Sequence, residues 1–445
     1  SFEKIRTYAD FVNFVPIRDY EGLKPYIEQI INGEKNILWP GKPIYFCKTS
    51  GTTSGEKYIP ISAEGMPNHI KAARDAMLSY IAETKKTNFV NGKMIFLQGS
   101  PELSKTGGVL TGRLSGIVAH HIPSYLKKNR LPSYKTNCIS DWEKKVDAIV
   151  DETISEKMSV ISGIPPWVQM YFEKLKKKSG LLIKDIFPHF ELFIYGGVNF
   201  TPYKSNFEKL IGKKIDGIEL YPASEGFIAY QDSQKKKGML LCVNHGIFYE
   251  FIPADQFFKT KPKRLSLADV KIGENYVIIL NTNSGLWGYN IGDTVKFVSI
   301  DPYRIIVSGR IKHFTSAFGE HVIAEEVERS LKKAVEKIPA QINEFHVAPQ
   351  VNPKSGLPFH EWLIEFEKKP EDIGILEKKI DEALQKQNSY YKDLICGNVL
   401  SPLKITTIKK GGFRKYMHSI GKLGGQNKVP RLANDRKIAN QLKEI

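Results

Sequence analysis

The sequence predicts an α/β protein with a large N-terminal domain and a small α+β domain at the C-terminus. A chain of 445 residues is too long for one small domain, so we expect two. Strand and helix patterns alternate from about residue 141 to 221, which is typical of parallel sheets covered by helices. After Gly238, strand patterns follow one another without a helix between them. We therefore expect the large domain to combine mixed parallel sheets and helices with an antiparallel β part.

The alternating region begins with a helix pattern and a short apolar strand. A second helix should start at Pro165 and end at Gly180, because proline suits the first helical turn and glycine the position after the last. The expected elements are helices at 141–157, 165–180 and 201–212, and strands at 158–164, 191–197 and 216–221.

The antiparallel part and the small domain follow. One strand is expected at each of the ranges 238–253, 275–282, 294–300 and 303–309. A new α+β unit then has helices at 323–338 and about 371–386, and strands at 342–349, 360–367 and 403–411. We place the boundary at Gly309-Arg310. This gives a large domain of residues 1–309 and a small domain of residues 310–445.

The composition excludes several protein classes. With 41% hydrophobic and 25% charged residues, it is that of an ordinary globular protein. No run of about eighteen apolar residues exists, so we expect no membrane span, and residues 1–11 lack the features of a signal peptide. The four cysteines are far apart without metal-ligand spacing. We therefore expect reduced, buried thiols in a cytoplasmic protein. We also expect the protein to be a monomer or dimer.

The net charge of +17 leaves two interpretations open. One is a lysine-rich solvated surface, and the other is binding to nucleic acid or another anionic surface. The charge is uneven, because residues 401–445 contain eleven Lys and Arg residues against Asp435 and Glu444. We expect this tail to be either a nucleic-acid arm or a lid that meets a polyphosphate.

The segment "CKTSGTTSGEKYIP", residues 47–60, has the composition of a phosphate-binding loop. Its backbone amides, hydroxyl groups and Lys57 can all donate to phosphate oxygens. It is not the P-loop of nucleoside triphosphatases, because three residues instead of four separate Gly51 from Gly55, and the lysine does not follow directly. By itself the pattern is weak, since loops rich in Ser, Thr and Gly are also common surface turns.

Three later motifs strengthen this interpretation. "IYGG" ends a strand at Gly196 and Gly197, where backbone can approach a flat ligand. "YPASEGF" offers Tyr221 to stack on a base and Glu225 to hold a metal. "GYNIGD" places Asp293 after a tight turn, as for a ribose diol. Each also has a structural interpretation: a strand-ending turn, a core tyrosine with a surface glutamate, and a hairpin cap.

The order of these motifs resembles the adenylate-forming, firefly luciferase-like superfamily. After Gly-Asp come "GRIK" with "FGEHVIAEEVE", and then a lysine near the C-terminus. Within the superfamily, the chain is most similar to the acyl acid amido synthetases of the Gretchen Hagen (auxin-responsive promoter) family. That similarity rests on "FVPIRDYEGLKPYIEQIINGEKNILWP", "YPASEG" and "GGQNKVPRL", and it extends from about Tyr8 to Asn434.

The resemblance implies a two-step ligase that uses ATP and Mg²⁺. Residues 1–309 would bind ATP and the acid, and residues 310–445 would form a mobile domain that carries the catalytic lysine. A small carboxylic acid attacks the α-phosphate to give an acyl-adenylate and pyrophosphate, and an amine, usually of an amino acid, then displaces AMP. Such chemistry needs positioned donors, a metal and a lysine, not a nucleophilic side chain.

Two alternatives to this interpretation remain. One is an acyl-CoA or aryl-CoA ligase, which shares the first step. The other is a nucleic-acid-binding protein that uses the basic tail. The tail has only Phe413 and Tyr416 to stack on bases, so we expect no nucleic acid partner.

The resemblance also implies roles for particular residues. The residues that should line the phosphate loop are Ser50, Gly51, Thr52 and Thr53, with Lys57 near its exit. In this segment "TSGT" stands where the family often has Ser-Ser-Gly-Thr, which keeps the hydroxyl. The residues that should hold the rest of the nucleotide are Gly196, Gly197 and Tyr221 at adenine, Glu225 at magnesium, and Asp293 with Arg310 at the ribose.

Three further residues are expected to act on the acid or on domain motion. Lys428 should meet the α-phosphate and the attacking carboxylate, and with Glu225 it forms the expected catalytic pair. Without the resemblance, Lys428 would read as one more surface lysine. Arg113 is the candidate for binding the carboxylate of the acid. Lys312, in "GRIK", is the expected hinge between the two domains.

Overall fold

The computed structural model describes residues 2–50, 56–197, 200, 204–311, 314–315, 322–396, 400–423, 428–433 and 435–445. The chain divides into two compact units. Unit 1 runs from the N-terminus to Ile291 and includes residues 295–306, and unit 2 comprises residues 292–294 and 307–445. The division falls within strand β15 (Tyr303–Arg310), beside the boundary expected at Gly309-Arg310.

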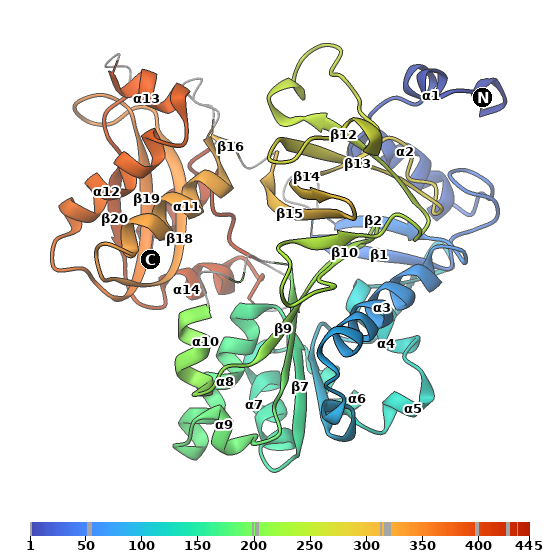
Figure 1. The fold of residues 1–445 in the computed structure, drawn as a ribbon, viewed down its shortest axis with the longest axis horizontal. Coiled ribbons are helices and arrows are strands. Elements are labelled where there is room, and N and C mark those ends of the chain that lie inside the picture. Colours follow the sequence, from blue (N-terminus) through green and yellow to red (C-terminus); the bar gives the residue numbers. More distant parts are fainter. Residues whose placement is uncertain are drawn as a thin grey trace. The chain divides into compact units, whose positions relative to one another are not determined.

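A long mixed sheet organises unit 1 (Figure 1). Among the described residues it has eleven strands, in the order β12-β13-β14-β15-β11-β10-β9-β8-β7-β3-β6. The end that runs from β9 to β6 is parallel, whereas β10 pairs antiparallel with both β9 and β11. Its other strands are β3 (Lys93–Leu97), β6 (Arg130–Leu131), β7 (Met158–Gly163), β8 (Leu192–Gly196), β9 (Asp216–Ala223), β10 (Gly226–Tyr230), β11 (Met239–Leu241), β12 (Ile247–Pro253), β13 (Asn275–Thr282) and β14 (Tyr289–Ile300).

Helices cover both faces of the parallel end (Figure 1). On one face, α7 (Trp142–Thr153), α8 (Pro165–Ser179) and α10 (Lys204–Ile211) share a core with the strands, and on the other face α3 (Met66–Thr84) does so. The adjacent residues Val160 and Ile161 of β7 belong to these two different cores, as successive residues of a strand must. Strands buried on both faces explain the continuous apolar runs in the sequence.

Proline and glycine residues set the ends of several of these elements. Helix α8 begins at Pro165 and ends before Gly180. Gly180 has a φ of 75°, a left-handed conformation that ends a right-handed helix. The predicted run at 238–253 is instead two strands, β11 and β12, because the chain turns at Gly246 with a φ of 72°. Strand β14 starts at Tyr289, earlier than the expected residue 294.

A smaller four-stranded sheet in unit 1 carries the Ser/Thr/Gly segment. Its order is β2-β1-β5-β4, with β1 antiparallel to β2 and parallel to β5. Helix α2 (Tyr20–Ile31) shares a core with β1 and β2 through Tyr20, Leu23 and Phe46. The strands are β1 (Tyr45–Ser50), β2 (Glu56–Ile61), β4 (Ser104–Thr106) and β5 (Val109–Gly112). The shorter helices of unit 1 are α1 (Tyr8–Phe14), α4 (Leu114–His120), α5 (Ser124–Lys127), α6 (Tyr134–Asn137) and α9 (Ile183–Ile186).

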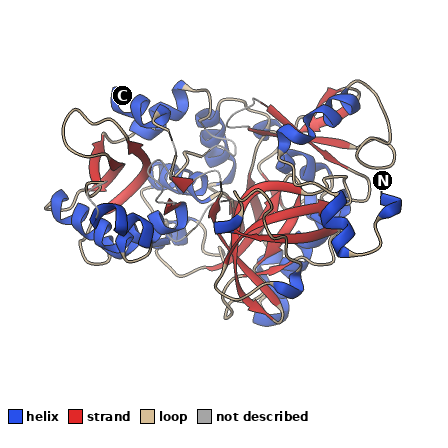
Figure 2. Cartoon of the chain, turned by 90° about the horizontal axis from the view of Figure 1, so that it is seen from above, coloured by secondary structure: helices blue, strands red, loops and turns tan. Residues whose placement is uncertain are grey.

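Unit 2 is an α+β unit around the sheet β18-β19-β20. Helices α11 (Ala324–Val335) and α12 (Ile373–Gln385) share one core with the sheet, and α14 (Gly412–Ser419) and α15 (Lys437–Glu444) share the other. In Figure 2 its strands, in red, are flanked by helices, in blue. The remaining elements are β16 (Phe314–Thr315), β17 (Val322–Ile323), β18 (Gln341–Gln350), β19 (Phe359–Lys368), α13 (Ser389–Cys396) and β20 (Lys404–Ile408). The predicted fold class is confirmed.

The basic tail has an explanation that the sequence reading did not include. It folds into β20, α14 and α15, and several of its cations pair with carboxylates of β18 and β19 in the same unit. Arg436 and Lys443 both contact Glu361, at 2.5 and 2.9 Å, and Glu361 is 3% exposed. Part of the tail's charge therefore holds the tail on its own sheet.

The cysteines differ from the expectation of four buried thiols. Cys47 and Cys242 are buried, but Cys138 is only partly buried and Cys396 is exposed. No helix in the described part of the chain is long and apolar enough to cross a membrane.

Candidate functional site

The Ser/Thr/Gly segment connects two paired strands of unit 1. Strand β1 pairs antiparallel with β2 up to Ser50 opposite Glu56, so the loop closes a β-hairpin. Gly51, Thr52 and Thr53 lie outside the described residues, as does the side chain of Ser50. Lys57, on β2, places its Nζ 5.3 Å from the centre of the Tyr20 ring, which favours a cation there.

The "YPASEGF" motif forms the tip of a second hairpin. Strands β9 and β10 are joined by two residues, Ser224 and Glu225, with Ala223 paired to Gly226. A two-residue connection is the shortest common hairpin turn, so it fixes both side chains closely. Cys47 of β1 donates to the Ser224 hydroxyl across 3.0 Å. This contact brings together two motifs that lie 177 residues apart in the chain.

Tyr289 supports the carboxylate of Glu225. Its ring is 3% exposed, and its hydroxyl is hydrogen-bonded to Glu225. Burial, followed by the charge and hydrogen bond of Glu225, raises the pKa of Tyr289 well above its ordinary value. The phenol therefore remains a hydrogen-bond donor to the carboxylate at all ordinary pH values. A β-bridge between Tyr289 and Arg18 holds the backbone at this point.

Tyr20 and Tyr289 were not assigned to a site from the sequence. Both belong to the core that packs under β1 and β2, together with Phe46 and Cys47. The Tyr20 hydroxyl accepts a hydrogen bond of 2.9 Å from the backbone N–H of Tyr58. The signal was present, because the two tyrosines lie in "RDYEGLKPY" and "GYNIGD", segments that contributed to the resemblance. Their structural role depends on contacts between distant parts of the chain.

Arg113 lies at the N-terminus of α4, close to Cys47 and Lys145. It is the N-cap residue of that helix, and a Cβ at Gly99 would lie 2.9 Å from its Cδ. Lys145 is 2% exposed, and its Nζ donates to the carbonyl oxygens of Gln98 and Asn137. Burial, and to a lesser degree Arg113, lowers the pKa of Lys145 to about 8. Arg113 therefore adds to a positively charged surrounding, which suits an anionic partner.

Packing within the protein itself requires a glycine at the first position of the glycine pair. A Cβ at Gly196 would lie 2.3 Å from the carbonyl oxygen of Leu220 on β9, so only glycine fits there. Gly197 follows with a φ of 77°. The close backbone approach at Gly196 is thus made by the neighbouring strand. Tyr221 is 8% exposed and belongs to the core formed with β11 to β15.

Asp293 and Arg310 lie on the neighbouring strands β14 and β15. Asp293 follows Gly292, whose φ is 87°, inside β14, and does not directly follow the turn at Gly288 as the sequence suggested. The carbonyl oxygen of Gly292 accepts a hydrogen bond of 2.7 Å from Ile311. The structure therefore brings the backbones of these two residues together. The side chain of Arg310 and the whole of Lys312 lie outside the described residues.

Lys428 begins a short segment that adds to the edge of β18 in unit 2. Lys428 is exposed, whereas Val429 is 8% exposed and Leu432 is fully buried. Val347 of β18 donates to the Arg431 carbonyl and accepts from Ala433, both at 2.9 Å. His346, the residue before Val347, is fully buried, and its Nδ1 lies 2.6 Å from the Pro430 carbonyl oxygen.

The residues of unit 1 fit a magnesium ion that is held mainly by substrate. Within the described residues, no group of three or more metal-ligating side chains occurs. Mg²⁺ is commonly bound by one or two carboxylates together with phosphate oxygens and water. Glu225 supplies such a carboxylate, because it is partly exposed at a turn and oriented by Tyr289.

Named relatives share most of this chain. It is 23% identical to a jasmonoyl–L-amino acid synthetase (JAR6) of Nicotiana attenuata, over 95% of this chain and 85% of that protein. It is 21% identical to the indole-3-acetic acid-amido synthetase GH3.3 of Arabidopsis thaliana, over 95% and 83% respectively. A match at 24% identity to a second Nicotiana attenuata synthetase (JAR4) covers 64% of this chain and 60% of that protein.

Solved structures share the fold. The GH3.15 acyl acid amido synthetase superposes with a TM-score of 0.80 at 16% identity, over 98% of this chain and 87% of that one. A 2-hydroxyisobutyryl-CoA ligase superposes with a TM-score of 0.58 at 13% identity, over 100% and 86% respectively.

Family domains match three parts of the sequence. Residues 1–141 match the GH3 family N-terminal domain, residues 240–310 the central domain and residues 325–437 the C-terminal domain. The segment between the first two ranges contains the glycine pair and the Glu225 hairpin, and Ser224 of that hairpin contacts Cys47 of β1. Since these ranges together cover well over half of the 445 residues, the family predicted from the motif order is confirmed, and the chain belongs to the GH3 family.

Proposed function

We propose that the chain is an ATP-dependent ligase that activates a small carboxylic acid as an acyl-adenylate and joins it to an amine, usually of an amino acid. The observation that carries this proposal is the contact between Cys47 and Ser224, at 3.0 Å. It holds the Ser/Thr/Gly/Lys hairpin beside the Glu225 turn, and these are the parts needed around a triphosphate. The amido synthetases among its relatives support the same reaction class.

Glu225 is the residue that would hold Mg²⁺ together with the phosphates. A bound Mg²⁺ neutralises charge on the phosphate oxygens. The protein's own contribution is orientation, because Tyr289 donates to the carboxylate and the two-residue turn fixes its position. Backbone amides of the 51–55 loop and Lys57 would bind the phosphates.

Nucleotide and acid recognition follow from the other proposed residues. Asp293 and Arg310, on adjacent strands, would bind the ribose hydroxyls, while Gly196, Gly197 and Tyr221 would contact adenine. Arg113 would bind the carboxylate of the acid, in keeping with its positive surroundings near Lys145. A bidentate guanidinium suits a carboxylate better than an amine does.

Lys428 would bind the α-phosphate and the attacking carboxylate. An exposed lysine on a short edge segment suits a group that contacts its substrate during one half-reaction only. Lys312 remains the proposed hinge that would bring unit 2 into place. We expect the enzyme to act in the cytoplasm on small-molecule substrates.

A pyrophosphate-release screen tests the proposal. Purified protein with ATP and Mg²⁺ is offered a panel of carboxylic acids, each with and without a pool of amino acids, and products are identified by mass spectrometry. We expect acid-dependent pyrophosphate release, and amide product only when the pool is present. A thioester formed from added CoA would instead identify an acyl-CoA ligase. No pyrophosphate release with any acid, and no ATP binding at millimolar concentration by calorimetry, would contradict the assignment.

A further inference from the structure

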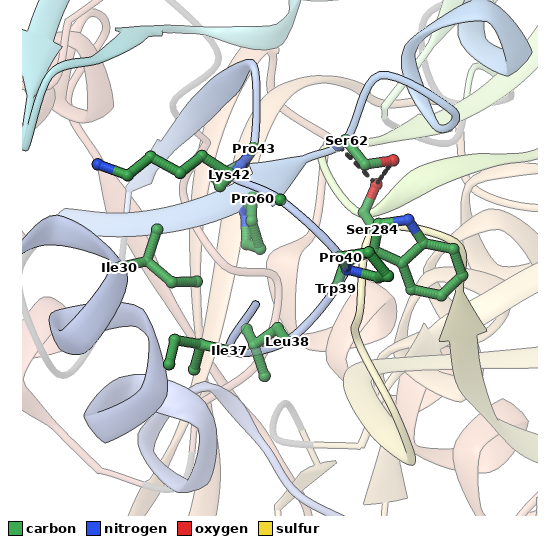
Figure 3. Close-up of a pocket in the computed structure, with 11 residues that line it drawn as sticks. Ile30, Ile37, Leu38, Trp39, Pro40, Lys42, Pro43, Pro60, Ser62 and Ser284 are labelled. Carbon is green, nitrogen blue, oxygen red and sulfur yellow. Dashed lines mark hydrogen bonds between the residues drawn. The ribbon is translucent and has the colours of Figure 1, made fainter. Parts of the chain in front are cut away.

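Two hollows lie beside the N-terminal end of α3 in the described part of unit 1. The first, shown in Figure 3, has a volume of about 10 Å³ and is lined largely by apolar residues such as Ile37, Leu38 and Pro60. Ser62 and Ser284 lie at one side of it, joined by a backbone-to-hydroxyl hydrogen bond of 3.0 Å. This volume holds no more than about one water molecule. The first hollow therefore offers no place for a ligand.

The second hollow is a groove of about 510 Å³, which is within the range of small-molecule sites. Its walls come from the residue before β1, the first turns of α3 and the residue after α4. They are formed by Ile44, Ala63, Met66, Pro67, Asn68, Ile70, Lys71, Arg74 and His121.

We propose that this groove binds a small amphipathic carboxylate, an acid with an apolar body, at a site separate from the nucleotide loop. This site goes beyond the proposed ligase reaction and does not depend on it. Such a site needs a cationic wall for the carboxylate, an apolar wall for the hydrocarbon body and a position remote from the proposed triphosphate site.

The cationic wall is the face of α3 that carries Lys71 and Arg74. Residues three apart in a helix are neighbours on one face. Among the described lining residues, these two are the only acidic or basic ones apart from His121, and both are positive. Arg74 also contacts the adjacent Asp75 at 3.4 Å, but its side chain is 62% exposed, so water largely screens that pair. Because the described lining contains no carboxylate, it leaves a positive field for an anion.

The apolar wall is formed by Ile44, Pro67 and Ile70. Ile44 is 38% exposed, although it stands next to a buried sheet. Covering such a side chain with the hydrocarbon part of a ligand releases water from both surfaces. His121 closes this wall, because the Tyr45 hydroxyl lies 2.9 Å from its Nε2 and holds the ring edge-on. Burial, together with the charge of His120, lowers the pKa of His121, so it is a neutral hydrogen-bonding group at pH 7.

The groove lies at the end of β1 that is remote from Ser50. Ile44 precedes the first residue of the strand, whereas the loop follows its last residue, Ser50. A strand of this length spans ~20 Å at ~3.3 Å per residue. A small acid in the groove is therefore about one strand length away from Ser50, the residue at which the proposed phosphate loop begins.

Binding of octanoate tests the site. The titration is followed by NMR in the Arg113→Ala background, without ATP, so that the proposed acyl site does not contribute. We expect octanoate to bind, with 1-octanol and inorganic phosphate each weaker because each lacks one half of the ligand. Lys71→Ala with Arg74→Ala should weaken octanoate by about tenfold or more, since charge-assisted contacts to the carboxylate are lost. The matched control is Lys176→Ala with Lys177→Ala, exposed lysines of α8 that remove the same charge.

A second variant separates a specific site from general charge. Ile44→Ser should weaken octanoate but leave phosphate unchanged. Equal affinity of the Lys71 and Arg74 double variant and the α8 control would overturn the proposal. Complete displacement of octanoate by ATP would also overturn it, because the acid would then occupy the nucleotide region. Neither result depends on turnover, so the proposed ligase activity can succeed or fail independently.

Discussion

The carboxylate of Glu225 and the amine of Lys428 are held very differently. Glu225 stands in a two-residue turn between paired strands, and the buried hydroxyl of Tyr289 is bonded to it. Lys428 is exposed, in a segment that joins β18 through two backbone hydrogen bonds and through the contact of Pro430 with His346. Unit 1 thus fixes its group by burial and tight turns, whereas unit 2 presents its group from an edge.

This difference suits the two roles that we propose. A group that positions the triphosphate in both half-reactions gains from rigidity, because a misplaced ligand costs rate. A lysine that acts in one half-reaction must arrive and leave, so an exposed side chain at a sheet edge suits it. The comparison therefore predicts that variants at Lys428 affect one half-reaction, and that variants around Glu225 affect every nucleotide-dependent step.

Lys428→Ala should give the largest effect. We expect adenylate formation to fall by ~100- to 1,000-fold, because the lysine donates where charge develops, while ATP affinity changes by only a few fold. Supplying synthetic acyl-adenylate should restore amide formation. The measurements are acid-dependent pyrophosphate release and amide yield, with Lys409→Ala, an exposed lysine of the same unit, as the control. Near-normal pyrophosphate release would remove Lys428 from the mechanism.

Tyr289→Phe tests the rigid side of the comparison. The loss of a hydrogen bond to a charged group costs ~1.5–3 kcal/mol, so we expect turnover to fall by ~10- to 100-fold and the Mg²⁺ requirement to rise. Tyr249→Phe is the matched control, because that hydroxyl is also buried in unit 1 but bonds to backbone carbonyls. In a Glu225→Ala background, the Tyr289→Phe substitution should cause no further loss of turnover. If both tyrosine variants lose only stability, Tyr289 is purely structural.

His346→Ala tests how unit 2 presents its lysine. Loss of the hydrogen bond from His346 to the Pro430 carbonyl costs ~0.5–1.5 kcal/mol, so we expect adenylation to slow by ~3- to 10-fold. His346→Asn, which retains a donor, should recover part of the rate. The control is His360→Ala, a second fully buried histidine of the same sheet, which contacts the Tyr391 ring. Equal rate losses in both variants would indicate a general effect on unit 2 stability.

The elements that the sequence predicted best are those whose ends are marked by proline and glycine residues. Helix α8 between Pro165 and Gly180, and the strands around it, depend on backbone preferences that neighbouring residues decide. The order of the site motifs was also readable, because each motif is short and contiguous.

Contacts between distant parts of the chain could not be predicted from the sequence. Tyr289 gains its role from Glu225, and no local pattern connects the two. At Gly196, no local pattern shows that the carbonyl of Leu220 on the neighbouring strand also requires a glycine. The tail lysines and arginines were read as ligands for an outside polyanion, because their partners, such as Glu361, lie far away in the sequence.

Acid stability gives a last and smaller test of how unit 1 is built. His69, in α3, is 5% exposed, and burial lowers its pKa to about 4. Its unfolded pKa is ~6.5, so between these values the unfolded state binds more protons, and stability is lost as the pH falls below ~6.5. We expect His69 to cost ~1 kcal/mol of folding free energy between pH 7 and pH 5.5.

The measurement is chemical unfolding of wild type and His69→Gln at both pH values. His69→Gln should lose less stability on acidification, because glutamine takes up no proton, while its rate of adenylate formation at pH 7 should match wild type. His418→Gln, at an exposed histidine of unit 2, is the control. An unchanged acid sensitivity in His69→Gln would mean that water reaches this histidine in the folded state, and that α3 packs less tightly on the sheet than its burial indicates.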